Sequence, residues 1–566
     1  MRNRHVLGMI GATVVLSLAA SASADVPTQV DQPISRAAQV ITVADGNRGR
    51  MDGEMRLRYP GFEQTTVEAV GNHIVMVSME AVQEPNKAPV QCTCFSYELQ
   101  KDAAPKLVAQ KRLTDYGRMG TAERTCNHPK MVAAGENIVW SYGSDYNNNR
   151  PNTYVGVITK TCDQLAAPIM VNIPRDANDG APDIVYNGKV NGNDFFTLGY
   201  YSDGGDGPGF PQPGGDYSVA MGLELTQDGL LPKLERKWIM PIVTPTNIGR
   251  PTLAAAGADR TLFCAPKGPN RPSDHIECAL LDTATGNSVW KSVVATGDRQ
   301  KRIYFNQPTV ARLSDNRFAL MAIESNGQGK MTNNVKGSNV SHLFMMERNG
   351  DSFTLGGDAR GAAAHQTHAS ICTGAYGETE EPSVAVFSAA PTGIGRAAML
   401  MVGYNQAERS WKWDDRADLW PTAWYGDSGH LANWYGRNPM RQGRDYMRCI
   451  GGVANPGYHV EKGFMSDVKT FFVGPVHGRV PGEAKNSLFL SLVPGQVDKK
   501  ALPENPVPAG EAPALDPNAG TTPNSTPESS GGCGCTTPGR TSMPGGLGLA
   551  AAAALGLMVW SRRRRG

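Results

Sequence analysis

The feature that most constrains the fold is a short phrase that recurs along the chain. In its clearest copy, Pro129 is followed by alternating apolar residues, a turn glycine at Gly135 and a second apolar run from Ile138. Proline is tolerated where a strand begins, and a glycine turn joins two strands tightly, so each copy predicts a pair of antiparallel strands. Copies with the same spacing run from Thr65 to Gly71, from Pro182 to Gly188 and from Pro251 to Gly257, and looser copies begin at Pro308, Pro382 and Pro456.

These seven copies lie about 50 to 75 residues apart, which is enough chain for one propeller blade of several short strands. A small sheet cannot bury both of its faces alone and must stack on neighbours around a ring. The sequence therefore predicts an all-β fold, a β-propeller of seven blades, with six blades as the alternative number and a pair of β-sandwiches as the competing fold. Residues 37–59 are expected to supply a closing strand for the last blade, which ends near Leu492 and Val493.

Residues 281–291 read Leu-Asp-Thr-Ala-Thr-Gly-Asn-Ser-Val-Trp-Lys. This turn followed by a tryptophan resembles the repeat phrase of quinoprotein-type propellers, in which the tryptophan has a docking role. The phrase occurs once here, so the resemblance supports a propeller and implies no quinone. We expect no cofactor, with structural Ca²⁺ as the alternative.

The first 24 residues have the pattern of a signal peptide. Two arginines precede an apolar run from Val6 to Ala20, and Ala22-Ser23-Ala24 is a small-x-small cleavage signal. An uncleaved anchor is the alternative, but the apolar run is shorter than the roughly 20 residues that span a bilayer. We therefore expect an exported chain with a propeller body over residues 25–497.

The C-terminal part has the composition of a stalk followed by a sorting tail. Residues 498–532 are rich in Pro, Thr, Ser and Gly and carry too few large apolar side chains to fold. Within residues 533–566, Cys533 and Cys535 precede an apolar run and four terminal arginines, which the positive-inside rule keeps cytoplasmic. This order closely resembles the myxobacterial C-terminal sorting signal, MYXO-CTERM.

The resemblance implies that a sorting protease cuts the tail near its cysteines. Cys533 or Cys535 would then be the processing and lipidation site, and the protein would stay at the outer surface of a Gram-negative cell. The protein would contact the membrane through its C-terminal anchor. The alternative is an ordinary single-span tail anchor with two incidental cysteines.

The formal net charge of +2 comes from the two ends of the chain. Seven of the 55 basic residues are arginines of the signal peptide and the tail, which leaves 48 against 53 acidic residues, a net charge near −5. The body contains no basic cluster. This charge balance argues against nucleic acid as a partner.

Eight cysteines lie in the body, and an even number in an exported chain indicates disulfides. They are Cys92, Cys94, Cys126, Cys162, Cys264, Cys278, Cys372 and Cys449. Cys264 and Cys278 lie in two apolar runs joined by a Pro/Gly/Asn-rich turn, so we predict a bridge between them and leave the other pairings open. A metal site at Cys92-x-Cys94 is disfavoured by its one-residue spacing.

The residues before each proline are expected at one mouth of the central channel, where the innermost strands begin. This ring comprises Asn127-His128, Gly180-Ala181, Gly249-Arg250, Asn306-Gln307, Glu380-Glu381 and Ala454-Asn455. Converging polar groups are typical of a small-ligand pocket, and Arg250 is the ring residue that we assign to ligand binding. The alternative is that these polar residues only cap the strand starts.

Residues 404–436 form a tryptophan-rich insertion before the last repeat. Its tryptophans are Trp411, Trp413, Trp420, Trp424 and Trp434. Flat aromatic faces edged by charged groups are suited to binding sugar rings or a protein partner. The alternative is that the insertion buries its tryptophans against itself.

Two segments carry residues of metal-binding type. His365 and His368 lie three residues apart without an obvious helix, and two solvated histidines are the alternative. Asp176, Asp179 and Asp183 are suited to Ca²⁺, but no bidentate glutamate stands at the required distance. We therefore assign no metal.

The sequence lacks the common enzyme signatures, including G-x-S-x-G, H-E-x-x-H, the P-loop, the Rossmann glycines and the sialidase boxes. We predict a non-catalytic, surface-anchored propeller that binds an extracellular polysaccharide or envelope protein. The alternative is a secreted hydrolase or lyase acting on polysaccharide, with Glu380, Glu381 and His128 as catalytic residues. Paired carboxylates about 5 to 10 Å apart would favour the enzyme.

Overall fold

The computed structural model describes a body made of strands. The described residues are 34–44, 62–117, 126–145, 152–171, 179–202, 216–246, 250–268, 274–326, 339–363, 370–373, 383–388, 398–405, 410–418, 449–454, 470–479 and 486–494, with short gaps inside several ranges. The chain divides into Met1–Gly520 and Thr521–Gly566, and all described residues belong to the first unit. Every regular element of this described part is a β-strand.

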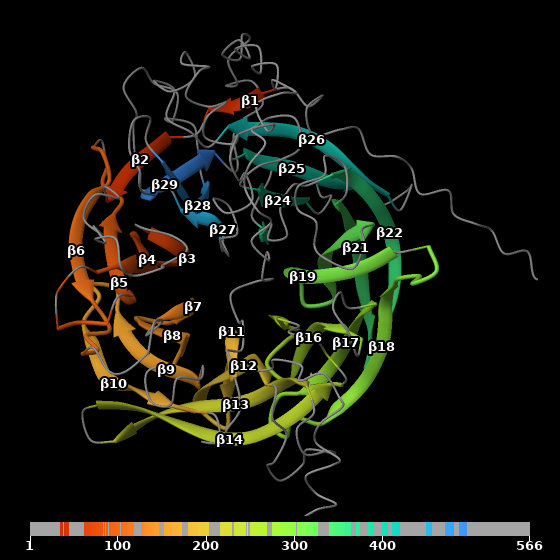
Figure 1. Cartoon of the computed structure of the whole chain (residues 1–566), viewed down its shortest axis with the longest axis horizontal. Coiled ribbons are helices and arrows are strands. Elements are labelled where there is room, and N and C mark those ends of the chain that lie inside the picture. Colours follow the sequence, from red (N-terminus) through yellow and green to blue (C-terminus); the bar gives the residue numbers. More distant parts are fainter. Residues whose placement is uncertain are drawn as a thin grey trace, which may run out of the picture. The chain divides into compact units, whose positions relative to one another are not determined.

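The strands form seven sheets, which we call blades 1 to 7 in chain order (Figure 1). Blade 1 contains β3 (Phe62–Val70), β4 (His73–Ala81), β5 (Val90–Glu98) and β6 (Lys106–Arg112). Blade 2 contains β7 (Asn127–Ala134), β8 (Asn137–Ser144), β9 (Asn152–Thr159) and β10 (Gln164–Met170), and blade 3 contains β11 (Asp179–Val190), β12 (Asn193–Ser202), β13 (Tyr217–Asp228) and β14 (Leu231–Val243). Blade 4 contains β15 (Thr252–Ala255), β16 (Arg260–Lys267), β17 (His275–Asp282) and β18 (Ser288–Thr296), and blade 5 contains β19 (Ile303–Ser314), β20 (Arg317–Asn326), β21 (Asn339–Asn349) and β22 (Ser352–Ala363). Blade 6 contains β23 (Ser370–Thr373), β24 (Ser383–Ser388), β25 (Ala398–Asn405) and β26 (Ser410–Asp418), and blade 7 contains β27 (Ile450–Ala454), β28 (Thr470–Arg479) and β29 (Asn486–Pro494).

The blades close into a ring through their innermost strands. These strands are β3, β7, β11, β15, β19, β23 and β27. Each contacts the next in this order, and β27 in turn contacts β3 (Figure 1). The predicted β-propeller is therefore confirmed, and the β-sandwich alternative is wrong.

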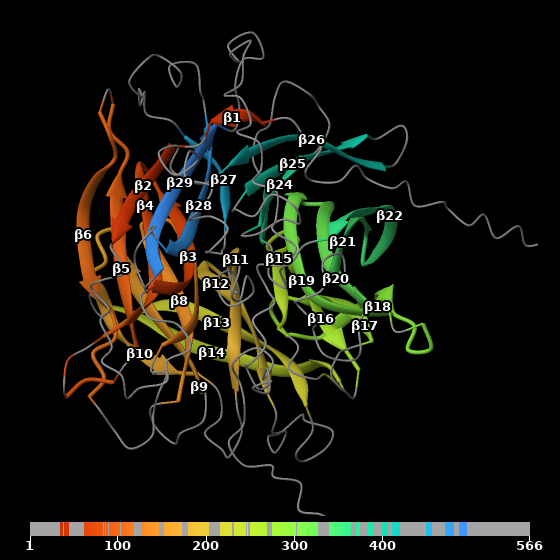
Figure 2. The ribbon, with the colours of Figure 1, turned by 45° about the horizontal axis from the view of Figure 1, so that its top comes forward.

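Two N-terminal strands complete the last two blades. β2 (Gln39–Ala44) pairs antiparallel with β29, so that Gln39 lies opposite Leu492, as the sequence predicted for the closing strand. β1 (Ile34–Ala37) pairs parallel with β26 of blade 6, which the sequence did not predict. In Figure 2, β2 lies beside β29 where the first and last parts of the body meet.

The apolar core lies between the faces of neighbouring blades. All nine residues of β4 are buried, whereas the outermost strand β6 buries only one of its seven. A strand that is buried on both faces is expected to be a near-continuous apolar run, and β4 fits this pattern. Val75 and Trp140 belong to one apolar cluster that joins blades 1 and 2, and Leu280 and Phe318 to another that joins blades 4 and 5.

The recurring phrase marks a β-bulge in the inner strand. The register shifts between Glu63 and Thr66 in β3 and between Asn127 and Lys130 in β7, and corresponding shifts occur in β11 and β19. A bulge tolerates proline and re-aims the neighbouring side chains. These inner strands therefore begin several residues before the proline and not at it, which corrects the predicted strand starts.

Three copies of the phrase depart further from the prediction. In the Pro182 copy, Asn191 and Gly192 form the turn, and Gly188 lies at a second bulge inside β11. Pro382 precedes β24, the second strand of blade 6, and Pro456 follows β27. Both looser copies misplace the inner strand because β23 and β27 neither contain a proline nor directly follow one, unlike β15, which follows Pro251.

Four disulfides cross-link the described part of the body. Cys264–Cys278 joins the neighbouring strands β16 and β17, as predicted. Cys92–Cys126 and Cys94–Cys162 tie blade 1 to blade 2, and Cys372–Cys449 ties β23 to the residue before β27. Since Cys92 and Cys94 are both bonded to other cysteines, they form no metal site.

Candidate functional site

The two ends of the ring differ in their connections. We call the end at which the inner strands begin the mouth, and the opposite end the base. At the base of blades 1 to 5, several connections are only two residues long, at 71–72, 135–136, 191–192 and 315–316. Connections at the mouth are longer, as between β12 and β13 or between β20 and β21. Binding and catalytic residues gather on loops held by a rigid scaffold, so the mouth is the candidate site.

At the mouth, Gln64 of β3 contacts His128 of β7. The side-chain carbonyl of Gln64 accepts the backbone N–H of His128 at 2.7 Å, and the Gln64 amide nitrogen lies 3.3 Å from His128 Nε2. His128 is buried and Gln64 is half-buried. His128 is one of the predicted pre-proline residues, whereas Gln64 escapes that pattern because Thr65 replaces the proline in its copy.

Similar contacts join further inner strands. Asp183 Oδ2 accepts the backbone N–H of Leu253 at 3.0 Å, which links blades 3 and 4. Thr252 Oγ1 accepts the backbone N–H of Val310 at 3.1 Å, which links blades 4 and 5. An inner strand forms one edge of its sheet. The N–H groups on its unpaired side therefore need hydrogen-bond acceptors outside the sheet. Asp183, one of the residues considered for Ca²⁺, thus has a structural contact here.

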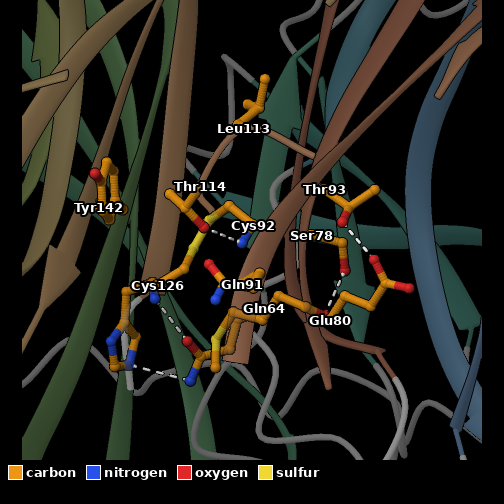
Figure 3. Close-up of a disulfide and its surroundings, with 12 residues drawn as sticks. Gln64, Ser78, Glu80, Gln91, Cys92, Thr93, Leu113, Thr114, Cys126 and Tyr142 are labelled. Atoms are coloured by element: carbon orange, nitrogen blue, oxygen red, sulfur yellow. Dashed lines mark hydrogen bonds between the residues drawn. A yellow bond between two sulfur atoms is a disulfide. The ribbon is translucent and has the colours of Figure 1, made fainter. Parts of the chain in front are cut away.

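The seam between blades 1 and 2 is closely bonded (Figure 3). The Cys92–Cys126 disulfide crosses it, and the Thr114 hydroxyl accepts the backbone N–H of Cys92 at 2.7 Å. The hydroxyls of Tyr116 and Tyr142 lie 2.7 Å apart, and burial raises the pKa of Tyr142 well above its usual value. The disulfide and the paired tyrosine hydroxyls therefore cross-link blades 1 and 2 at this seam.

Two buried glutamates occupy equivalent positions in blades 1 and 5. Glu80 lies near the mouth end of β4, and Glu324 lies near the mouth end of β20. Each glutamate is the register partner of a phenylalanine in the inner strand of its blade. The Glu80 carboxylate accepts the Thr93 hydroxyl, and Glu324 Oε2 lies 2.6 Å from His342 Nε2. Both carboxylates are satisfied within their own blades.

The remaining members of the predicted ring fall at different places. Gly180 lies near the start of β11, Asn306 lies in β19, and half-buried Arg250 precedes β15. Glu380 and Glu381 lie outside the described residues, and the strand that follows them, β24, begins beside Thr373 at the end of β23. Ala454 is the last residue of β27 and not a residue at its start.

Several other predicted residues lie outside the described part. Trp411 and Trp413 belong to β26 itself, so the predicted insertion begins inside a blade. The predicted site residues outside the described part also include Trp420, Trp424, Trp434, His365, His368, Asp176, Cys533 and Cys535. Among the residues that are described, no group of three or more His, Cys, Asp or Glu side chains is placed to hold a metal ion, and no helix is long and apolar enough to span a bilayer.

The quinoprotein-like phrase forms a turn on which a neighbouring blade docks. Trp238 of blade 3 donates its indole N–H to the carbonyl of Thr283 at 2.9 Å, and its ring covers Gly286. Trp290, the tryptophan of the phrase, packs on Phe353 of blade 5 with 5.1 Å between ring centroids. Docking by Trp238 is not evident from sequence, because this residue lies outside the phrase.

No known protein family and no curated protein matches the chain. Among solved structures, the α-L-arabinanase of Penicillium chrysogenum in complex with arabinobiose is 10% identical, over 81% of this chain and 97% of its own, with a TM-score of 0.38. The GH93 α-L-arabinofuranosidase of Fusarium graminearum with arabinobiose is 10% identical, over 81% and 98%, with a TM-score of 0.40. The Trypanosoma rangeli sialidase with sialic acid is 10% identical, over 80% and 71%, with a TM-score of 0.33.

These comparisons correct the predicted function. The similar structures are named as an arabinanase, an arabinofuranosidase and a sialidase, and our prediction of a non-catalytic binding propeller is therefore wrong. At this identity the likeness concerns the fold alone. The chemistry has to be argued from the mouth of this chain.

Proposed function

We propose that the protein is an exported glycoside hydrolase that cleaves an extracellular polysaccharide at the mouth of its propeller. The observation that carries the proposal is the set of bulges near the starts of four inner strands, β3, β7, β11 and β19. Bulges re-aim side chains and are common next to active sites. They place polar residues where the long connections of the mouth meet the rigid ring.

The proposal assigns the acid and base roles to Glu63 and Asp179 from the positions of their backbone in β3 and β11. Glycoside hydrolysis needs two carboxyl groups, one to protonate the leaving oxygen and one to activate water or attack the sugar. Glu63 lies at the bulge of β3, and Asp179 begins β11 at the mouth. The carboxylates of Glu80, Asp183 and Glu324 already bond groups of the body.

The tryptophan-rich segment supports the same location. Residues 419–449 connect the end of β26 to the start of β27, and both of these strand ends belong to the mouth. In this proposal, Trp420, Trp424 and Trp434 stack on sugar rings of the polymer, since aromatic faces give a large apolar contact area.

The test is the release of reducing ends by the purified full-length protein from linear arabinan, xylan, a β-1,3-galactan and a uronic-acid polymer. Glu63→Gln and Asp179→Asn are each expected to lower the rate about 100-fold or more, as for loss of an acid or base catalyst. Glu136→Gln, in an exposed turn at the base, is the matched control and is expected to keep the rate.

The outcomes separate the two parts of the proposal. Failure to cleave any of the four polymers would overturn the hydrolase function. Cleavage that survives both carboxylate substitutions would overturn only the assignment of Glu63 and Asp179.

We also propose that the protein acts at the cell surface and is retained there through its tail. The order of Cys533, Cys535, the apolar run and the terminal arginines supports this location, and four disulfides fit an oxidising compartment. Replacing both cysteines with serine is expected to abolish surface retention, measured by protease accessibility on intact cells. A mature wild-type protein that still ends in the four arginines would contradict this processing.

A further inference from the structure

Gln64 and His128 share an unfavourable backbone conformation. Their φ angles are 48° and 53°, in the left-handed region that residues other than glycine rarely adopt. They lie on the inner strands of neighbouring blades, each at the bulge of its strand. Such conformations persist only where the surroundings over-determine them, and they are typical of functional sites.

The contact between the two residues fixes the orientation of the Gln64 amide. Its oxygen accepts the backbone N–H of His128 at 2.7 Å. The amide nitrogen must then face the imidazole, and it lies 3.3 Å from Nε2. An exchange of oxygen and nitrogen would set an NH₂ group against a backbone N–H, so the backbone contact selects one of the two orientations.

This orientation determines the tautomer of His128. An amide NH₂ group donates and cannot accept, so His128 Nε2 must be the acceptor and carries no proton. The proton of the neutral ring is therefore on Nδ1. In metal and catalytic sites, the partner of one imidazole nitrogen likewise sets the role of the other.

The seam does not depend on Gln64 for its integrity. The Cys92–Cys126 disulfide crosses the same boundary two residues before His128, and Pro129 restrains the backbone directly after it. Gln91, a buried glutamine of blade 1, donates to the carbonyls of Ala88 and Tyr116. Because these contacts hold the seam without Gln64, the specific role of the Gln64 side chain is its contact with the ring of His128.

We propose that Gln64 is a positioning residue, which holds the imidazole of His128 at the mouth in one orientation and as the neutral Nδ1–H tautomer. Any effect of this tautomer on catalysis rests on the proposed hydrolase function. The tautomer itself is measured without substrate, so the inference stands or falls separately from that function.

The experiment is a two-bond ¹H–¹⁵N correlation spectrum of the full-length protein with ¹⁵N-labelled histidine, which distinguishes the two tautomers. The chain has ten histidines, and His128→Asn identifies the signals of His128 by their loss. In the wild type we expect an unprotonated Nε2 and a protonated Nδ1. In Gln64→Glu, the carboxylate still accepts the backbone N–H but presents a second acceptor to the ring, so Nε2 is expected to become protonated.

Two further variants keep the test decisive. Gln64→Met removes the side-chain donor and is expected to give a mixture of the two His128 tautomers. This variant replaces Gln64→Glu in the test if Gln64→Glu does not fold. Gln91→Met is the matched control in blade 1 and is expected to leave the His128 signals unchanged. A protonated Nε2 in the wild type, or an unchanged Nδ1–H tautomer in folded Gln64→Glu and Gln64→Met, would overturn the proposal.

Discussion

At the scale of single residues, the ring is joined near its axis by polar side chains. Gln64, Asp183 and Thr252 each accept a backbone N–H from the next inner strand. Such bonds satisfy edge groups that would otherwise be buried without partners, at a cost of about 1 to 3 kcal/mol each. Farther out, Trp238 joins blade 3 to blade 4 by donating its indole N–H to the carbonyl of Thr283, and its packing on Gly286 leaves no room for a larger residue.

Gly286→Ala tests this docking contact. Gly286 has a φ of 75°, and an added Cβ would lie 2.5 Å from the Trp238 ring, whereas Gly135 has a φ of 61° with nothing within 4 Å. We expect Gly135→Ala to cost about 1 kcal/mol from backbone strain and Gly286→Ala about 2 to 4 kcal/mol from strain plus overpacking. Guanidinium unfolding measures both, and equal costs would show that the docking contact is loose.

At the scale of elements, the sequence predicts a blade where local chemistry defines its first two strands. The Pro129 and Thr65 copies, with glycine turns at Gly135 and Gly71, give the observed strand pairs because proline, glycine and alternation act over a few residues. In blades 6 and 7 the prediction misplaces the inner strand, because β23 and β27 have no proline within or directly before them to mark their start.

The candidate site was harder to predict than the blades. The Gln64–His128 contact joins residues 64 positions apart and depends on two left-handed bulges. No local pattern encodes such a pairing, because it arises only when neighbouring blades stack. The recurring phrase still predicts His128, one of the two residues of this contact, because His128 directly precedes Pro129.

The connection between blades 4 and 5 predicts a pH dependence. Arg260 of β16 bonds Asp351 in the turn before β22, and this hydrogen bond lowers the pKa of Asp351 from its usual 3.8. A carboxyl group with a lowered folded-state pKa stabilises the fold above its unfolded pKa, and this stability is lost as the pH falls through the folded value. Asp351→Asn is therefore expected to lower the melting temperature slightly at pH 7 and to flatten its decline below about pH 4.

A double-mutant cycle is the control for this effect. In an Arg260→Met background, Asp351→Asn is expected to change the melting curve less, because the hydrogen-bond partner is absent and only the charge of Arg348 still acts on the carboxylate. An additive loss in the double variant would assign the effect of Asp351 to another contact.

At the scale of the whole molecule, long-range links hold the ring closed. Cys372–Cys449 closes a loop of 77 residues and Cys264–Cys278 a loop of 14. In the chain-entropy account, the longer loop stabilises by about 1.5 kcal/mol more. The double variant Cys372→Ser/Cys449→Ser should therefore unfold at lower denaturant than Cys264→Ser/Cys278→Ser, and the opposite order would contradict this account.

The pairing of β2 with β29 orders events during synthesis. The strand at residues 39–44 leaves the ribosome first, and its partner at residues 486–494 follows only after every blade has been made. Until then, β2 is an unpaired edge, the type of strand that invites pairing with other chains. The newborn protein must therefore keep β2 unoccupied until β29 arrives.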